Sequence, residues 1–349
     1  MKIRVKNKKV LLAVLAVFVV VAVIASVYVY RYWADHKSSN FSREYALYVY
    51  PDMTPRDVLD SLCSGAEVKN SASLERCFNE VNMSASLRPG KYVIKPEHTS
   101  IYVARMLANG WTSPQNLTLS GTIRTKATLA SKISSQMMVD SASVAQALES
   151  EEFLSEYGFT PEDVFSMILP DTYQMHWDES VEGIFDRFKK EYDKFWNEER
   201  LAKARSLRLS QLEVSVIASI VSGETNAASE YSTIAGVYLN RYRKGMKLQA
   251  DPTVAFCFNY ELNRVLKKHL AVDSPYNTYK YKGLPPAPIN VPPKACVDAV
   301  LNPDKHGYIF FCASPDFDGT HRFAVTYKDH QKNARAFQKA LDARQKAAN

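Results

Sequence analysis

The residue with the clearest potential for chemistry is Glu224, in the stretch "ASIVSGETN" (218–226). On a helix, Glu224 lies about 20° from Ile217 and about 40° from Ile220, so it falls on the apolar face. A carboxyl group there is desolvated, which favours its neutral form and raises its pKa. Such a group can donate a proton to a leaving oxygen and then act as a base. Spacing alone leaves an alternative open, a helix-terminal glutamate that turns to water or pairs with a lysine.

Other polar residues around Glu224 have plain structural interpretations. Ser229 is predicted to be the N-cap of the next helix, where the helix dipole would stabilise Glu230 without any catalytic role. Asp251 precedes Pro252 and is predicted to cap a further helix, and Gln249 offers a polar contact.

The segment "IASIVSGETNAASEYSTIAGVYLNRYRKGMKLQADPTV" (217–254) resembles the core signature of the endolytic murein transglycosylases, the MltG or YceG-like family. Further matching stretches occur in the same order along the chain. They are "LPDTYQ" (169–174), "YNTYKYKGLPPAPI" (276–289), "YIFFCAS" (308–314), and "THRF" followed by a second histidine, His330, nine residues after His321.

The resemblance implies lytic cleavage of the β-1,4 bond between N-acetylmuramic acid and N-acetylglucosamine in peptidoglycan. The product then ends in 1,6-anhydro-muramic acid, because the sugar's own 6-hydroxyl attacks the anomeric carbon. The family's catalytic glutamate falls on Glu224. One carboxyl group can serve as acid and then as base, whereas ordinary glycosidases need two. We expect no cofactor and no metal.

Five residues fall on motif positions that would line the glycan groove. They are Gln249, Asp251, Asn277, Tyr279 and His321. Their hydroxyl, amide and imidazole groups suit sugar hydroxyl and N-acetyl groups, and a tyrosine face can stack on a sugar ring. Each could instead be structural. Ser222 and Gly223 stand where the family pattern leads us to expect charged residues. This departure leaves the catalytic position intact but would alter the groove shape or the pKa of the glutamate.

Two other functions remain open. The first is a hydrolytic muramidase that uses Glu224 with Glu230 or Asp251. The second is a non-catalytic glycan-binding scaffold for wall synthesis. Peptidoglycan strands are the expected substrate, and peptidoglycan synthases (penicillin-binding proteins) are expected partners from family and topology alone.

The N-terminus predicts a membrane anchor. Residues 10–30 carry no charge and are long enough, as a helix, to span a hydrocarbon core of about 30 Å. Basic residues precede them and aromatic residues follow, which predicts a cytoplasmic N-terminus and an extracytoplasmic, periplasmic remainder. A cleaved signal peptide is the alternative, but bulky residues continue after the apolar core. Five of the seven net positive charges lie in the first nine residues, so the rest of the chain offers no surface for nucleic acid.

The pattern of elements predicts an α+β protein with a single transmembrane helix, a small βααβ LysM-like domain and a larger mixed α+β catalytic domain. The predicted boundaries are a cytoplasmic tail (1–9), an anchor (10–30), a polar linker (31–43), the LysM-like domain (44–110) and the catalytic domain (111–349). LysM modules bind glycans that contain N-acetylglucosamine, although a domain that only packs is equally compatible with the pattern.

Local signals place several elements. Thr54, Thr99 (or Ser100) and Thr125 (or Thr128) are predicted N-caps. Helices are predicted over 141–158, 182–204, 210–224, 229–244 and 328–347, and a strand over 308–314. None of the five cysteines forms a CxxC zinc motif. Cys63 and Cys77 could pair, although we expect mostly buried free thiols.

Overall fold

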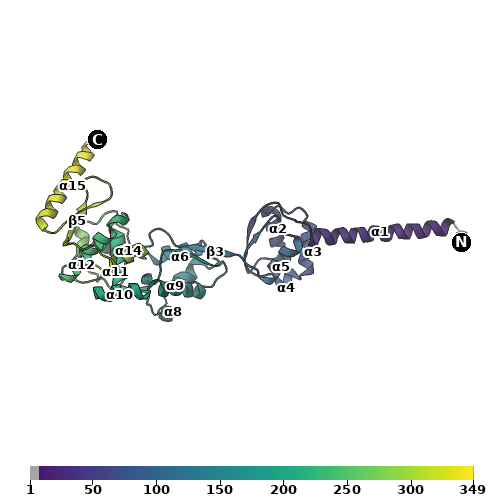
Figure 1. Ribbon diagram of the computed structural model, residues 1–349, viewed down its shortest axis with the longest axis horizontal. Coiled ribbons are helices and arrows are strands. Elements are labelled where there is room, and N and C mark those ends of the chain that lie inside the picture. The colour runs from purple at the N-terminus through teal and green to yellow at the C-terminus, as the bar shows by residue number, and fades with distance from the viewer. Residues whose placement is uncertain (1–7, 349) are drawn as a thin grey trace. The chain divides into compact units, whose positions relative to one another are not determined.

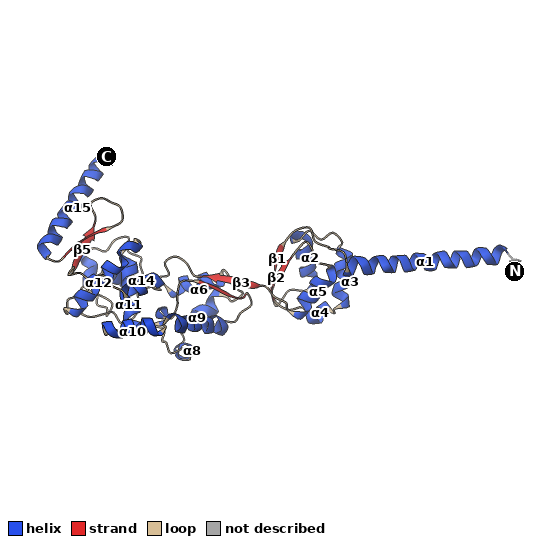
Figure 2. Cartoon of the chain, viewed as in Figure 1, coloured by secondary structure: helices blue, strands red, loops and turns tan. Residues whose placement is uncertain are grey.

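The computed structural model describes residues 8–348 and divides into two compact units. The smaller unit comprises residues up to Asn116 together with Gln174–Asp178. The larger unit comprises Leu117–Tyr173 and the chain from Glu179 onward. Helices predominate in both units, and the described strands form two-stranded sheets (Figures 1 and 2). The boundary runs through β3 (Pro114–Thr118) and β4 (Thr172–His176), which form one of these sheets.

The first helix, α1 (Lys8–His36), contains the predicted membrane anchor. Its segment from Val10 to His36 is long and apolar enough to cross a bilayer, and none of its most apolar part is buried in the protein. This supports a single-pass anchor. Most of the predicted cytoplasmic tail, residues 1–7, lies outside the described residues.

The predicted polar linker (31–43) is wrong as a description of structure. Helix α1 continues through His36, because no proline or glycine interrupts it. Asp35 pairs with Arg76 of the smaller unit, with an Oδ1–Nη2 distance of 2.5 Å, and Phe41 is fully buried. The Asn40 amide donates to Ser100 Oγ over 2.8 Å. The segment is therefore part of the smaller unit, in which Asp35, Asn40 and Phe41 are buried.

Two antiparallel strands and four short helices complete the fold of the smaller unit. They are β1 (Tyr45–Val49), α2 (Pro55–Gly65), α3 (Ser71–Glu80), α4 (Met83–Ser86), β2 (Gly90–Ile94) and α5 (Ser100–Asn109). The register pairs Tyr45 with Ile94 and Val49 with Gly90. Side chains from both strands and from the helices form one buried cluster that includes Leu62.

The predicted caps of this unit are confirmed. Thr54 forms a capping box with Asp57, and proline occupies the first helical position of α2. Thr99 caps α5, and Gly110 ends it in the left-handed conformation. The structure therefore has the predicted β-α-α-β order, with α4 as an additional helical turn before β2.

The larger unit is mostly helical. In chain order it contains α6 (Lys126–Ser134), α7 (Ser141–Glu149), α8 (Glu151–Ser155), η1 (Val164–Ser166), α9 (Val181–Phe195), α10 (Glu198–Leu207), α11 (Gln211–Glu224), η2 (Ala228–Glu230), α12 (Tyr231–Arg243), α13 (Asp251–Cys257), η3 (Lys267–Ala271), α14 (Lys294–Leu301), β5 (Phe310–Ala313), β6 (His321–Ala324) and α15 (Tyr327–Ala348). Helix α11 packs against α12, α13 and α14, so it lies at the centre of this part (Figure 1).

The structure corrects two predicted helices, confirms one predicted cap and answers the question of cysteine pairing. The expected helices 141–158 and 182–204 are each two helices, because Ser150 and Asn197 cap new helices after a break. Thr125 is confirmed as the cap of α6. All five cysteines are free thiols, so Cys63 and Cys77 do not pair.

Candidate active site

Helix α11 fixes the position of Glu224. Ser210 and Glu213 form a capping box at its start, and the eight residues from Val214 to Val221 are all buried. Glu224 is the last helical residue, where the negative end of the helix dipole disfavours an ionised carboxylate. The apolar core therefore holds the helix, and the helix carries its final carboxyl group to the edge of that core.

The Glu224 carboxyl group has a strongly perturbed environment. Burial by the surrounding protein is the main cause that raises its pKa, to about 7, and nearby Asp251 adds to the increase. Two groups oppose it. The Tyr238 hydroxyl donates a hydrogen bond to Glu224 Oε1 over 2.6 Å, and the Arg241 guanidinium lies nearby. The carboxyl group can thus hold or release a proton near neutral pH.

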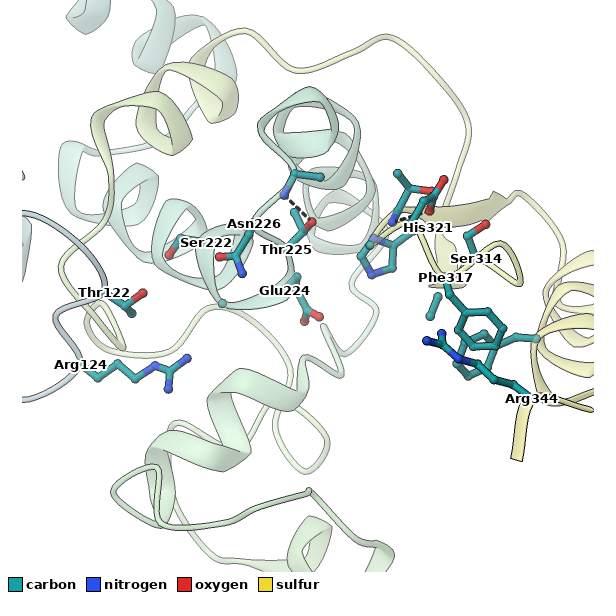
Figure 3. Close-up of a pocket in the computed structure, with 17 residues that line it drawn as sticks. Thr122, Arg124, Ser222, Glu224, Thr225, Asn226, Ser314, Phe317, His321 and Arg344 are labelled. Carbon is teal, nitrogen blue, oxygen red and sulfur yellow. Dashed lines mark hydrogen bonds between the residues drawn. The ribbon is translucent and has the colours of Figure 1, made fainter. Parts of the chain in front are cut away.

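Two cavities meet at Glu224 and form a groove. One has a volume of about 730 Å³ and the other about 310 Å³, and both are lined by Thr122, Arg124, Gly223 and Glu224. In Figure 3 the Glu224 side chain lies between Arg124 on one side and Arg344 on the other. A linear ligand that fills both cavities would pass directly over the carboxyl group.

Asp251 and Tyr279 lie together at the smaller cavity. Tyr279 donates its hydroxyl hydrogen to Asp251 Oδ1 over 2.6 Å, and Asp251 lines the cavity. The predicted capping role of Asp251 is wrong, since it is the first helical residue of α13 and Ala250 is the N-cap. Burial raises the pKa of Tyr279, so its hydroxyl keeps its proton.

His321 reaches the larger cavity from β6 and is held by Glu230. The Glu230 carboxylate accepts from the His321 backbone N–H over 2.8 Å, and its other oxygen lies 2.8 Å from His321 Nδ1. Glu230 is buried, so the predicted plain role at a helix start is incomplete. Ser229 is also not the N-cap, because a 3-10 turn precedes α12 and Glu230 occupies the cap position without a side-chain bond.

Asn277 and Gln249 lie outside the two cavities. Asn277 is fully buried, and its amide donates to the carbonyl groups of Leu270 and Val272 while its Oδ1 accepts from Tyr279 N–H. The exposed Gln249 has a φ of 54°, and its Oε1 accepts from Arg241 Nη1 over 3.3 Å. Asn277 therefore positions the Tyr279 backbone from inside the core.

Sequence reasoning missed the roles of Tyr238, Arg124 and Glu230 at this site. Tyr238 lies among the buried residues of α12. Its hydroxyl was a usable signal, because a buried tyrosine needs a hydrogen-bond partner. Arg124 lies in a loop before α6, and no local pattern marks it. The Glu230–His321 pair joins residues 91 positions apart, which no local pattern can show.

Among residues 8–348, no group of three or more His, Cys, Asp or Glu side chains is arranged to hold a metal ion.

Comparisons with known proteins agree with the geometry. The model of the YceG-like family matches residues 47–336. The endolytic murein transglycosylase of Bacillus subtilis (strain 168) is 35% identical over 166 residues, which are 47% of this chain and 45% of the relative. The protein of the same name from Streptococcus pneumoniae serotype 2 (strain D39) is 28% identical over 171 residues, 48% of this chain and 31% of the relative. The aligned regions thus span less than half of these curated relatives.

A solved structure shares the fold. The crystal structure of a yceG-like protein, lmo1499, from Listeria monocytogenes superposes with a TM-score of 0.54 at 25% identity. The match covers 84% of this chain and 99% of that one.

Proposed function

This chain belongs to the YceG-like family, and from that premise we propose that it is an endolytic murein transglycosylase. Its substrate would be the glycan strands of peptidoglycan, cut at internal β-1,4 bonds between N-acetylmuramic acid and N-acetylglucosamine. The observation that carries the proposal is the single carboxyl group, with a pKa of about 7, at the junction of two cavities. Relatives named endolytic murein transglycosylase support it.

The reaction needs one group that is first an acid and then a base. Protonated Glu224 gives its proton to the glycosidic oxygen as the bond from that oxygen to the anomeric carbon breaks. The 6-hydroxyl of the muramic acid attacks the same carbon, and its proton returns to the Glu224 carboxylate. The products are a free 4-hydroxyl on N-acetylglucosamine and a 1,6-anhydro-muramic acid end, with no water consumed.

Neighbouring groups would bind the sugars on the two sides of the cleaved bond. With Nδ1 held by Glu230, His321 keeps Nε2 free for a sugar hydroxyl or N-acetyl group in the larger cavity. Asp251, fixed by the Tyr279 hydroxyl, would accept from sugar hydroxyl groups in the smaller cavity. Asn277 would act by positioning Tyr279, and Gln249 by holding Arg241 near Glu224.

The hydrolytic alternative needs a second carboxylate that can act as a base or nucleophile. Both Glu230 oxygens are engaged by His321, so Glu230 is poorly suited to that role. Asp251 also accepts a short hydrogen bond, from Tyr279. These contacts favour the lytic reaction over hydrolysis.

The N-terminal helix would anchor the enzyme in the cytoplasmic membrane, with a cytoplasmic N-terminus and an extracytoplasmic catalytic unit. The smaller unit would be a LysM-like module that contacts glycan. It presents exposed Tyr102 and Trp111, whose rings lie 5.9 Å apart and suit stacking on sugars. Peptidoglycan synthases that make the strands on the same membrane face are the proposed partners.

Product analysis tests the proposal. Purified glycan strands are digested with the full-length chain in detergent, and the ends are identified by mass spectrometry in water labelled with oxygen-18. We expect unlabelled anhydro ends from the wild type and none from Glu224→Gln. Labelled reducing ends would indicate a muramidase, and strand binding without any cleavage would indicate a scaffold.

A further inference from the structure

A third cavity opens beside the groove of the larger unit. It has a volume of about 470 Å³ and shares Arg124 and Tyr260 with the 310 Å³ cavity at Glu224. Arg124 lines all three cavities. A linear glycan that runs over Glu224 through the first two cavities leaves this third one, the branch cavity, as a side opening.

Among the described residues, Arg124 is a cation without an anionic partner. Its guanidinium carbon lies 4.9 Å from the centre of the Tyr260 ring, and the side chain is exposed. Within residues 8–348, no carboxylate lies within 4.0 Å of its nitrogens. A guanidinium over a ring can still present its N–H donors to a carboxylate in bidentate geometry.

The other charged groups of the branch cavity are already paired or hydrogen-bonded. Lys126 Nζ lies 2.7 Å from Glu149 Oε2, and Glu162 accepts the Tyr276 hydroxyl over 3.0 Å. The wall is aromatic, with the Phe256 and Tyr276 rings 4.5 Å apart. The cavity thus offers an apolar surface for short side chains and one available cation at its entrance.

We propose that the branch cavity binds the peptide stem of the muramic acid next to the cleaved bond, with Arg124 bound to a stem carboxylate. This inference rests on the proposed function. The sugars of the strand carry neutral hydroxyl and N-acetyl groups, whereas the stem leaves the strand sideways and carries carboxylates and short apolar side chains. A side opening with an unpaired guanidinium can bind the charged stem. The neutral sugars of the backbone offer no carboxylate to this guanidinium.

The test compares two substrates, strands with intact stems and strands stripped of stems by an amidase. The full-length chain is assayed in detergent for kcat/KM on each. We expect the wild type to prefer intact strands, and Arg124→Ala to reduce that preference about ten-fold, which is ~1.4 kcal/mol of binding. Ala127 lines the branch cavity but not the groove, so Ala127→Trp should reduce the preference while Ala127→Ser keeps it.

Arg344 supplies the matched control. Its guanidinium lies 4.9 Å from the Phe317 ring at the larger cavity, on the other side of Glu224 (Figure 3). Arg344→Ala should change the rates on both substrates by the same factor. Equal losses on both substrates for Arg124→Ala and Ala127→Trp, with unchanged melting temperatures, would overturn the stem site. Absence of cleavage of either substrate by the wild type would instead overturn the proposed function.

Discussion

The Tyr238 hydroxyl donates a 2.6 Å hydrogen bond to Glu224 Oε1, and this contact joins the buried face of α12 to the last residue of α11. Tyr238 is itself almost fully buried, and burial raises its own pKa well above the usual range. It therefore remains a proton donor at any physiological pH. The bond stabilises the ionised form of Glu224 and so limits how far burial can raise the carboxyl pKa.

Replacement of Tyr238 by phenylalanine should shift the pH profile of the enzyme. Without the donor, the pKa of Glu224 rises, so the acid form persists to higher pH. We expect the alkaline limb of kcat/KM to move up by about one pH unit, since a hydrogen bond to a charged group contributes ~1.5 kcal/mol.

Tyr242 provides the control for this variant. It lies on the same helix and donates to Glu213 Oε1 over 3.3 Å, away from the groove. Tyr242→Phe should leave the limb in place. An unmoved limb in Tyr238→Phe, or a limb at lower pH, would contradict this account of the Glu224 pKa.

The stability of the protein should depend on pH through Glu224. Its pKa is about 7 in the folded protein and 4.5 in the absence of perturbation. Between these values the folded state retains a proton that the unfolded state has lost, so stability falls as pH rises through this window. Glu224→Gln removes this pH-dependent fall in stability. The melting temperature of the variant relative to the wild type should therefore be higher at pH 8 than at pH 4.5.

The exposed Glu152 on α8 serves as a comparison for this measurement. Glu152→Gln should follow the wild type at both pH values. If the gain of Glu224→Gln is the same at both, the carboxyl group is not perturbed as described.

Much of the fold could be predicted because its signals are local. Thr54 with Pro55, and Thr125 before α6, mark helix starts through contacts within three residues. The apolar period of α11 also placed Glu224 on the core side of its helix. The same reasoning failed for residues 31–43, because a polar composition does not reveal that Phe41 packs into a distant core.

The site was less predictable for a physical reason. The burial of Glu224 at the centre of the site follows from helical phase. The residues that surround Glu224 come from elsewhere in the chain. Arg124 precedes Glu224 by one hundred positions, and His321 meets Glu230 across 91. Contacts at such separations depend on tertiary packing, which neither propensity nor periodicity encodes.

The Glu230–His321 pair should behave as one functional unit. Glu230→Gln leaves His321 Nδ1 without its charged partner, and we expect a drop of about ten-fold in kcat. His321→Ala should lower kcat by about the same factor. The double variant should have a kcat only slightly below that of the less active single variant. The exposed ion pair between Asp316 and Arg322 gives the control, because Asp316→Asn should change kcat less than two-fold. Additive losses in the double variant would show that the two residues act separately.

Gly223 should not tolerate a side chain, although it lies near the end of a helix. Alanine there would gain up to ~1 kcal/mol in helix propensity. However, its Cβ would lie 2.7 Å from Pro252 Cβ and 2.9 Å from Pro252 Cγ, atoms of a rigid ring next to Asp251. Overpacking of this kind costs ~1–3 kcal/mol and would displace the start of α13.

We therefore expect Gly223→Ala to lower both the urea midpoint and kcat/KM. At Gly307 the nearest atom to a new Cβ, Val325 Cγ2, is 3.7 Å away, so Gly307→Ala should stay within about 0.5 kcal/mol of the wild type. A stable and fully active Gly223→Ala would mean that α13 can move away without disturbing Asp251. In that case the close approach of Pro252 to α11 would not be what fixes the smaller cavity.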